Sequence, residues 1–252
     1  MTILPVVACL ALLPAAQAVS PAPDGCYPNF TTAEGCNALN FLTTGAGNSG
    51  LGWYALFSDS TGSFNTGVGG GALTLNNADS NTAVGAAALL LNTSGGENVA
   101  VGTDALVFNS IASDNNAVGA FALFNNDSSG NGSANFNNAH GRNALQANVD
   151  GTQNNAMGDD AMFNNTLGSF NTAVGDDALD GCVDGSSNVA VGYEDGPDVV
   201  SGCNIICIGA GRLHGGPFQY VDHNCSIDSL HDSTVSHDTI GHTRYLDCDH
   251  CC

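Results

Sequence analysis

The sequence contains no lysine and only three arginines, against 24 aspartates and glutamates. Its formal net charge is −21 at pH 7. A nucleic-acid interface needs cations that neutralise phosphates, so this balance argues against nucleic acid as a partner. An anionic membrane surface is disfavoured for the same reason.

Charged residues are scarce, at 11% of the chain, and there is a single tryptophan. Apolar residues nevertheless reach 43%, so the chain lacks the low hydrophobicity that is typical of disordered segments. Glycine occurs 33 times. Because each glycine inside a helix costs about 1 kcal/mol relative to alanine, an ordinary helical domain is disfavoured.

No stretch of about 20 apolar residues is present, so we expect no membrane-spanning helix. Residues 3–16 form a shorter apolar run, which is followed by the small-x-small pattern Ala16-Gln17-Ala18. This pattern is typical of a signal peptide. We therefore expect residues 1–18 to be a signal peptide and 19–30 to be an N-terminal cap or linker. The predicted location is secreted and extracellular, without membrane insertion.

The middle of the chain is an internal repeat of 17 residues, with one step of 16 and one of 22. Alanine and leucine follow the repeat glycine by three and four positions, with one methionine in the leucine position. One asparagine stands four residues before this glycine and another stands seven after it, giving the unit G-x-x-A-L-x-x-N-x-x-G-x-x-N-x-A-V. The repeat glycines are Gly35, Gly52, Gly69, Gly85, Gly102, Gly119, Gly141, Gly158, Gly175, Gly192 and Gly209.

A unit of this length is too short for a helix pair, and its two apolar stretches, A-L-x-x and A-V-G, suit short strands. We therefore predict two short strands and two tight turns per unit. Stacking of the units at about 4.8 Å would bury a thin core of alanine, valine and leucine, while asparagine side chains form amide ladders. The predicted fold is all-β: a parallel β-solenoid of about 11 coils over residues 31–209.

The same motifs resemble the head repeats of trimeric autotransporter adhesins, and similar runs occur in phage tail-fibre proteins. The resemblance covers roughly residues 31–209 and implies a left-handed β-roll, often in a three-chain assembly on an extracellular surface. The stretches that carry it are Asn81-Thr82-Ala83-Val84-Gly85, Asn98-Val99-Ala100-Val101-Gly102 and Asn171-Thr172-Ala173-Val174-Gly175.

Residues 210–252 break the repeat and are rich in cysteine and histidine, which predicts a C-terminal cap or assembly region. In an exported protein the cysteines favour disulfides, with zinc binding in the tail as the alternative. After removal of the signal peptide their number is odd, so one thiol is free or pairs with another chain. The disulfide candidates are Cys26, Cys36, Cys182, Cys203, Cys207, Cys225, Cys248, Cys251 and Cys252.

Carboxylates recur two residues after the repeat glycine, and Asp160, Asp177 and Glu194 belong to successive units. Stacked like charges repel, and either a shared proton or a calcium ion would relieve this repulsion. A solvated acidic surface is the alternative interpretation. No cofactor other than this possible calcium ion is indicated.

Asn-x-Ser/Thr sequons identify candidate glycosylation sites, and turn positions are accessible to the modifying enzymes. Two of them fall on the asparagine that follows the repeat glycine by seven positions. The candidates are Asn29, Asn92, Asn126, Asn131, Asn164 and Asn224.

No nucleophile elbow, P-loop or HExxH motif is present, so we expect a protein without enzymatic activity. An ice-binding surface would need a nearly unbroken threonine row, which the repeat lacks. The edges of a solenoid invite pairing, and this chain has cysteine-rich ends. We therefore predict a self-assembling, disulfide-linked extracellular fibre. The alternative is an adhesin or receptor-binding head that uses the 120–140 insertion to bind a glycan or cell-surface ligand.

Overall fold

A computed structural model describes residues 28–196, 200–209 and 226–227. The described part therefore covers most of the predicted repeat region. The expected signal peptide (1–18), most of the 19–30 segment and nearly all of the 210–252 region lie outside it.

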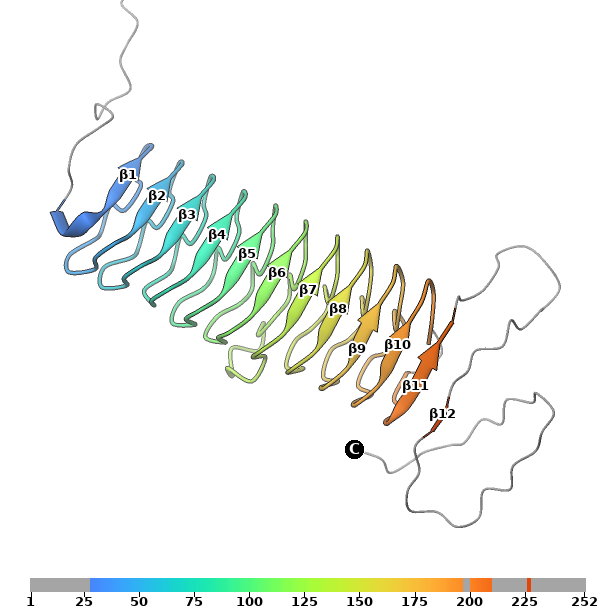
Figure 1. Ribbon diagram of the computed structural model, residues 1–252. Coiled ribbons are helices and arrows are strands. Elements are labelled where there is room, and N and C mark those ends of the chain that lie inside the picture. The colour runs from blue at the N-terminus through green and yellow to red at the C-terminus, as the bar shows by residue number, and fades with distance from the viewer. Residues whose placement is uncertain (1–27, 197–199, 210–225, 228–252) are drawn as a thin grey trace, which may run out of the picture.

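The described residues form a parallel β-solenoid in which each coil contributes one short strand to a single twelve-stranded sheet (Figure 1). Strands β1 to β11 follow one another in sequence order and pair in parallel, whereas β12 pairs with β11 antiparallel. The predicted parallel β-solenoid is confirmed. The strands are β1 (Thr32–Glu34), β2 (Ser49–Leu51), β3 (Thr66–Val68), β4 (Thr82–Val84), β5 (Val99–Val101), β6 (Asn116–Val118), β7 (Asn138–His140), β8 (Asn155–Met157), β9 (Thr172–Val174), β10 (Val189–Val191), β11 (Ile205–Ile208) and β12 (Ser226–Ile227). A short 3-10 turn, Pro28–Phe30, precedes β1.

The core is a narrow double row of small and aliphatic side chains. The middle residue of each strand points inward, and alanines such as Ala100 and Ala117 in this position are fully buried. The leucine of the A-L pair, for example Leu106 or Leu123, packs against this row from the opposite side of the coil. Because side chains alternate along a strand, the first and third residues of β1 to β10 point outward, and Ile206 and Ile208 are in register with them in β11.

The A-L segment is not a second strand, which corrects the expectation of two strands per unit. It forms two successive turns, in which the alanine N–H donates to the repeat-glycine carbonyl, as in Ala122 to Gly119 at 3.3 Å. The leucine has positive φ, 52° at Leu123. Its N–H still donates to the next coil, from Leu123 to the carbonyl of Ala144 at 3.0 Å. Backbone hydrogen bonds between neighbouring coils therefore continue through the A-L segment, although its backbone is not in the β conformation.

The repeat glycine is required by both conformation and space. Gly119 has a φ of +140°, and a Cβ atom there would lie 2.2 Å from the carbonyl oxygen of Gly141 in the next coil. A side chain at this position would clash with the backbone of its neighbour and strain its own.

One asparagine column, which we term the strand-leading column, joins each coil to the next through the backbone. Each Oδ1 accepts the backbone N–H of the residue at the same position one coil later, which is the next asparagine, as between Asn154 and Asn171 at 3.0 Å, or Ile205 after Asn188. The Asn154 Nδ2 donates to the Gly168 carbonyl at 2.8 Å. All members are buried, so these bonds satisfy backbone groups that water cannot reach. The column comprises Asn48, Asn65, Asn81, Asn98, Asn115, Asn137, Asn154, Asn171 and Asn188.

A second column, the turn column, is the amide ladder expected from the sequence. Each Nδ2 donates to the Oδ1 of the preceding coil, as from Asn109 to Asn92 at 2.9 Å. The same Nδ2 also donates within its own coil, from Asn109 to the Ala112 carbonyl at 2.8 Å. The column comprises Asn76, Asn92, Asn109, Asn126, Asn148 and Asn165, all fully buried.

The turn column ends in a different residue on each side. Asp59 occupies the position before Asn76, where its Oδ1 accepts the Gly62 N–H at 2.8 Å and its Oδ2 accepts the Asn65 amide at 3.1 Å. Burial raises the pKa of Asp59 from 3.8 to about 6, despite these bonds. At the other end Cys182 follows Asn165, whose buried Oδ1 has no hydrogen-bond donor within the described chain.

Candidate functional surfaces

At the N-terminal end of the solenoid, the first coil has no neighbouring coil within the described residues. In the second coil, the N–H groups of Gly52 and Tyr54 donate to the first coil at 2.8 and 3.0 Å. The equivalent groups of the first coil, the N–H of Gly35 and of Asn37, have no acceptor among the described residues. As far as residues 28–196 show, this end is an open edge, and the exposed Cys36 thiol lies within it.

The C-terminal end is partly covered. The pairs Ile205 with Ile227 and Ile206 with Ser226 place β12 antiparallel on the outer edge of β11. Cys203 and Cys207 close to this end are disulfide-bonded. The two ends therefore differ: an antiparallel strand from the tail occupies one edge, whereas no described segment occupies the other.

The 22-residue step forms a loop that projects from the rod between β6 and β7 (Figure 1). Buried Asp127 anchors it, because Oδ2 accepts the Ile111 N–H at 2.9 Å and Oδ1 accepts the Gly132 N–H at 2.7 Å. Residues 128–131 at its tip are exposed. A rigid base that carries an exposed polar tip suits recognition of another molecule.

The predicted acidic column is present at the end of the rod near β10. Burial together with repulsion from Asp160, Asp180 and Glu194 raises the pKa of Asp177. Part of this repulsion is relieved by hydrogen bonds, since Asp160 Oδ1 accepts the Asn143 amide at 2.7 Å. No group of three or more histidine, cysteine or acidic side chains in the described part converges as a metal site would. The calcium interpretation stays a prediction.

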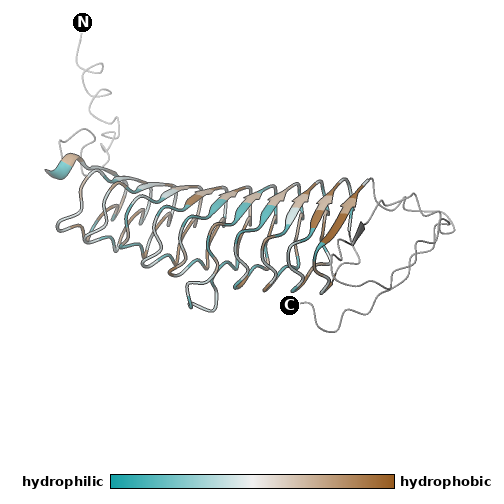
Figure 2. Cartoon of the chain, turned by 60° about the horizontal axis from the view of Figure 1, so that its bottom comes forward, coloured by the Kyte–Doolittle hydropathy of each residue, from teal (hydrophilic) through white to brown (hydrophobic). Residues whose placement is uncertain are grey.

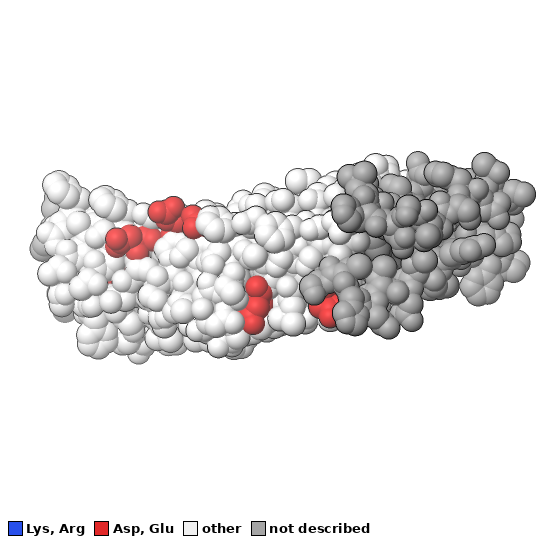
Figure 3. All heavy atoms as spheres, turned by 90° about the horizontal axis from the view of Figure 1, so that it is seen from below, with Lys and Arg blue, Asp and Glu red and all other residues white. Residues whose placement is uncertain are grey.

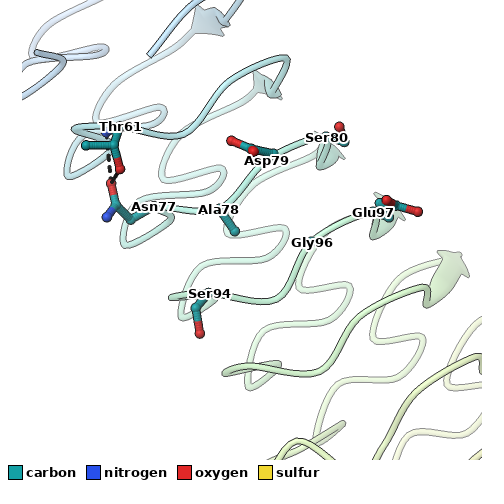
Figure 4. A pocket seen from close by; sticks show the side chains of 8 residues that line it. All are labelled: Thr61, Asn77, Ala78, Asp79, Ser80, Ser94, Gly96 and Glu97. Carbon is teal, nitrogen blue, oxygen red and sulfur yellow. Dashed lines mark hydrogen bonds between the residues drawn. The ribbon is translucent and has the colours of Figure 1, made fainter. Parts of the chain in front are cut away.

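On the face drawn in Figure 3, the acidic side chains of the described residues form separate patches. Two of them, Asp79 and Glu97, line an open groove of about 430 Å³ at the coil whose step is 16 residues (Figure 4). The Asn77 Oδ1 at its rim accepts hydrogen bonds from the Thr61 N–H at 3.0 Å and from the Thr61 hydroxyl at 3.1 Å. The lining presents hydroxyl, amide and carboxylate groups.

The structure separates the sequons by accessibility. Asn92 and Asn126 are fully buried in the turn column, with their Nδ2 atoms donating hydrogen bonds, so a glycan on either is incompatible with the folded coil. Asn29 and Asn164 are exposed, but their Nδ2 atoms donate to carbonyl groups. Asn131 alone among the described sequons is exposed at a loop tip with Nδ2 uncommitted.

Four of the nine cysteine candidates lie within the described residues. Cys26, Cys225, Cys248, Cys251 and Cys252 lie outside the described residues, as does the sequon Asn224. Cys36 and Cys182 carry free thiols. Cys182 is fully buried, and burial raises the pKa of its thiol to about 11, which makes it a poor nucleophile.

Comparisons with protein-family models, curated proteins and solved structures found no match for this chain. The adhesin-like resemblance therefore depends on the repeat motifs alone. In the described part of the chain, no helix is long and apolar enough to span a membrane.

Proposed function

We propose that this protein is a non-enzymatic, secreted structural subunit that assembles end to end into an extracellular fibre. The observation that carries the proposal is the N-terminal edge of the described solenoid. There the Gly35 and Asn37 N–H groups occupy the positions from which the later coils donate to the coil before them, as Gly52 and Tyr54 do. Unpaired edges of this kind are templates for another chain. The first coil of one copy would dock on the last coil of the next, where β12 pairs only with Ile205 and Ile206.

Two further features support assembly. The coil shape is nearly constant along the rod, so the first coil of one copy matches the shape of an internal neighbour. The exposed thiol of Cys36 lies in this first coil, where it could form a disulfide with a neighbouring copy. Neither feature requires a ligand or a cofactor.

Electron microscopy of the full chain tests the proposal, with Ala33→Pro as the edge variant. N–H groups alternate in direction along a strand, and Thr32 donates to β2 through the Asn48 carbonyl at 2.8 Å, so the Ala33 N–H points away from β2. Proline is tolerated on such an edge but blocks pairing there. Thr32→Val is the control, because it keeps every backbone donor.

We expect filaments from the wild type and from Thr32→Val, and short or single rods from Ala33→Pro. Electrophoresis without reductant should show covalent oligomers that Cys36→Ser removes. Single rods from the wild type at every concentration would contradict the fibre proposal.

The second candidate is an adhesin or receptor-binding head, and the projecting loop anchored by Asp127 favours it. This function makes the exposed tip at 128–131 the binding element. Binding of the full chain to cells or glycan arrays that is lost when Ser128 and Ser129 are changed to alanine, with filaments absent, would favour this candidate over the fibre.

A further inference from the structure

The outward residues of β1 to β11 form one continuous surface, which we term the sheet face. It consists of two columns, the first and the third residue of each strand from β1 to β10, continued in register by Ile206 and Ile208 of β11. The third-residue column is aliphatic or methionine except at its first and seventh positions. The first-residue column holds Thr32, Ser49, Thr66, Thr82, Val99, Asn116, Asn138, Asn155, Thr172, Val189 and Ile206. The third-residue column holds Glu34, Leu51, Val68, Val84, Val101, Val118, His140, Met157, Val174, Val191 and Ile208.

The third-residue column is half-buried to exposed along the rod, and its most exposed members are Met157 and Ile208, each at 56%. Val84, Val101, Val174 and Val191 are each exposed by 37–38%, and no described segment packs over them. Strand β11 is the most hydrophobic part of this surface, followed by β5 and β10, which both read Val-Ala-Val (Figure 2). An apolar stripe that runs the length of a rod exceeds the isolated apolar residues that are normal on a protein surface.

The sheet face also carries little charge. Among the acidic residues and arginines of the described part of the chain, only Glu34, in the first coil, belongs to either column. Carboxylates such as Asp159 and Asp176 instead follow the repeat glycine, where the chain turns away from the sheet. In a chain with a net charge of −21, this face is where another copy can approach with the least repulsion.

We propose that the sheet face is a lateral interface between two copies of this chain, which pairs the rods side by side. A cationic partner would be drawn to the carboxylates outside this face, whereas a second copy presents the same uncharged, apolar stripe. Eleven strands at about 4.8 Å and three residues at about 3.3 Å give a face of about 50 by 10 Å. Pairing would bury about 1,000 Å² in total, which fits a weak, specific dimer.

Lateral pairing is separate from end-to-end stacking, because it uses side chains along the rod rather than the backbone of the first coil. The two can therefore fail independently. Ala33→Pro should abolish filaments but leave the lateral dimer. A charge introduced on the sheet face should weaken the lateral dimer but leave the filaments.

Sedimentation equilibrium of the full chain in 0.15 M NaCl tests the proposal, with Ala33→Pro as the background that removes filaments. Val101→Glu places a carboxylate near the middle of the face, and Thr103→Glu adds the same charge two residues later, off the face and exposed. We expect a concentration-dependent dimer that Val101→Glu weakens at least tenfold and Thr103→Glu by less than twofold.

Thermal unfolding would check that Val101→Glu is folded, and Val84→Glu is the second variant if it is not. The proposal would be overturned by a monomer at all concentrations, by a discrete trimer, or by equal dimerisation of Val101→Glu and Thr103→Glu. A dimer that forms only after residues 210–252 are removed would also overturn it, since the tail would then be the natural occupant of the face.

Discussion

The two asparagine columns run through the same coils, yet they solve different problems. The strand-leading column links side chains to the backbone of the next coil, so each member satisfies a buried N–H that would otherwise lack a partner. The turn column links side chain to side chain. Both columns change residue type at their ends, the strand-leading column to Thr31 and Ile205 and the turn column to Asp59 and Cys182. The strand-leading contact still forms at Ile205, whose backbone N–H donates to Asn188 Oδ1 at 3.0 Å, because that contact needs only a backbone donor on the following coil.

The largest effect should come from breaking the strand-leading column. Asn154→Ala removes the acceptor of the Asn171 N–H and leaves that buried donor without a partner. Together with the cavity, this should destabilise the fold by about 2–4 kcal/mol. Asn155→Ala, one residue later and exposed, is the matched control and should cost less than about 0.5 kcal/mol. Denaturant unfolding measures the free energy of unfolding of both variants. Equal losses of stability would contradict the claim that the buried asparagine contributes more than the exposed one.

A smaller effect, in the stabilising direction, should come from extending the turn column. In Cys182→Asn the new Nδ2 can donate to the Asn165 Oδ1, which has no donor among the described residues. It can also reach the Gly185 carbonyl, which lies 3.5 Å from the Cys182 sulfur. One added hydrogen bond to a buried acceptor should stabilise the fold by about 1 kcal/mol. Cys182→Ala supplies no donor and should not stabilise, so a gain in both variants would assign the effect to packing.

An effect of a different kind should appear in the pH dependence of stability. Because burial raises the pKa of Asp59 to about 6 in the folded state, the folded chain binds this proton more tightly than the unfolded chain does. The contribution of Asp59 to stability is therefore largest below pH 4 and declines as the pH rises to about 6. Asp59→Asn should remove this decline, since an amide does not titrate. Melting temperatures of the two proteins at pH 4 and pH 7 measure the difference, and identical profiles would contradict the raised pKa.

The repeat allowed much of this architecture to be predicted from the sequence. The spacing of Gly119 and its equivalents predicts parallel coils, and Asn109 and its equivalents predict an amide ladder. The A-L turn could not be predicted in the same way, because a leucine with positive φ, such as Leu123, is unfavourable in isolation and depends on hydrogen bonds from neighbouring coils.

The site residues were less predictable for a related reason. A sequon indicates an accessible asparagine only if the side chain is not used for folding, and Asn92 and Asn126 are used in this way. The uncharged sheet face became apparent only when the strand register was known, because it is defined by positions 17 residues apart. Strand β12 lies outside the 17-residue repeat, so the repeat pattern did not predict that it covers part of one end.

Site-resolved amide hydrogen exchange tests most directly whether the buried strand-leading asparagines hold the coils together. The N–H groups of Asn115, Asn137 and Asn171 donate to asparagine side chains. We predict that they exchange only through global unfolding, with one common free energy, while the exposed loop amide of Ser129 exchanges quickly. Fast exchange of the column amides, at rates close to that of Ser129, would contradict this account.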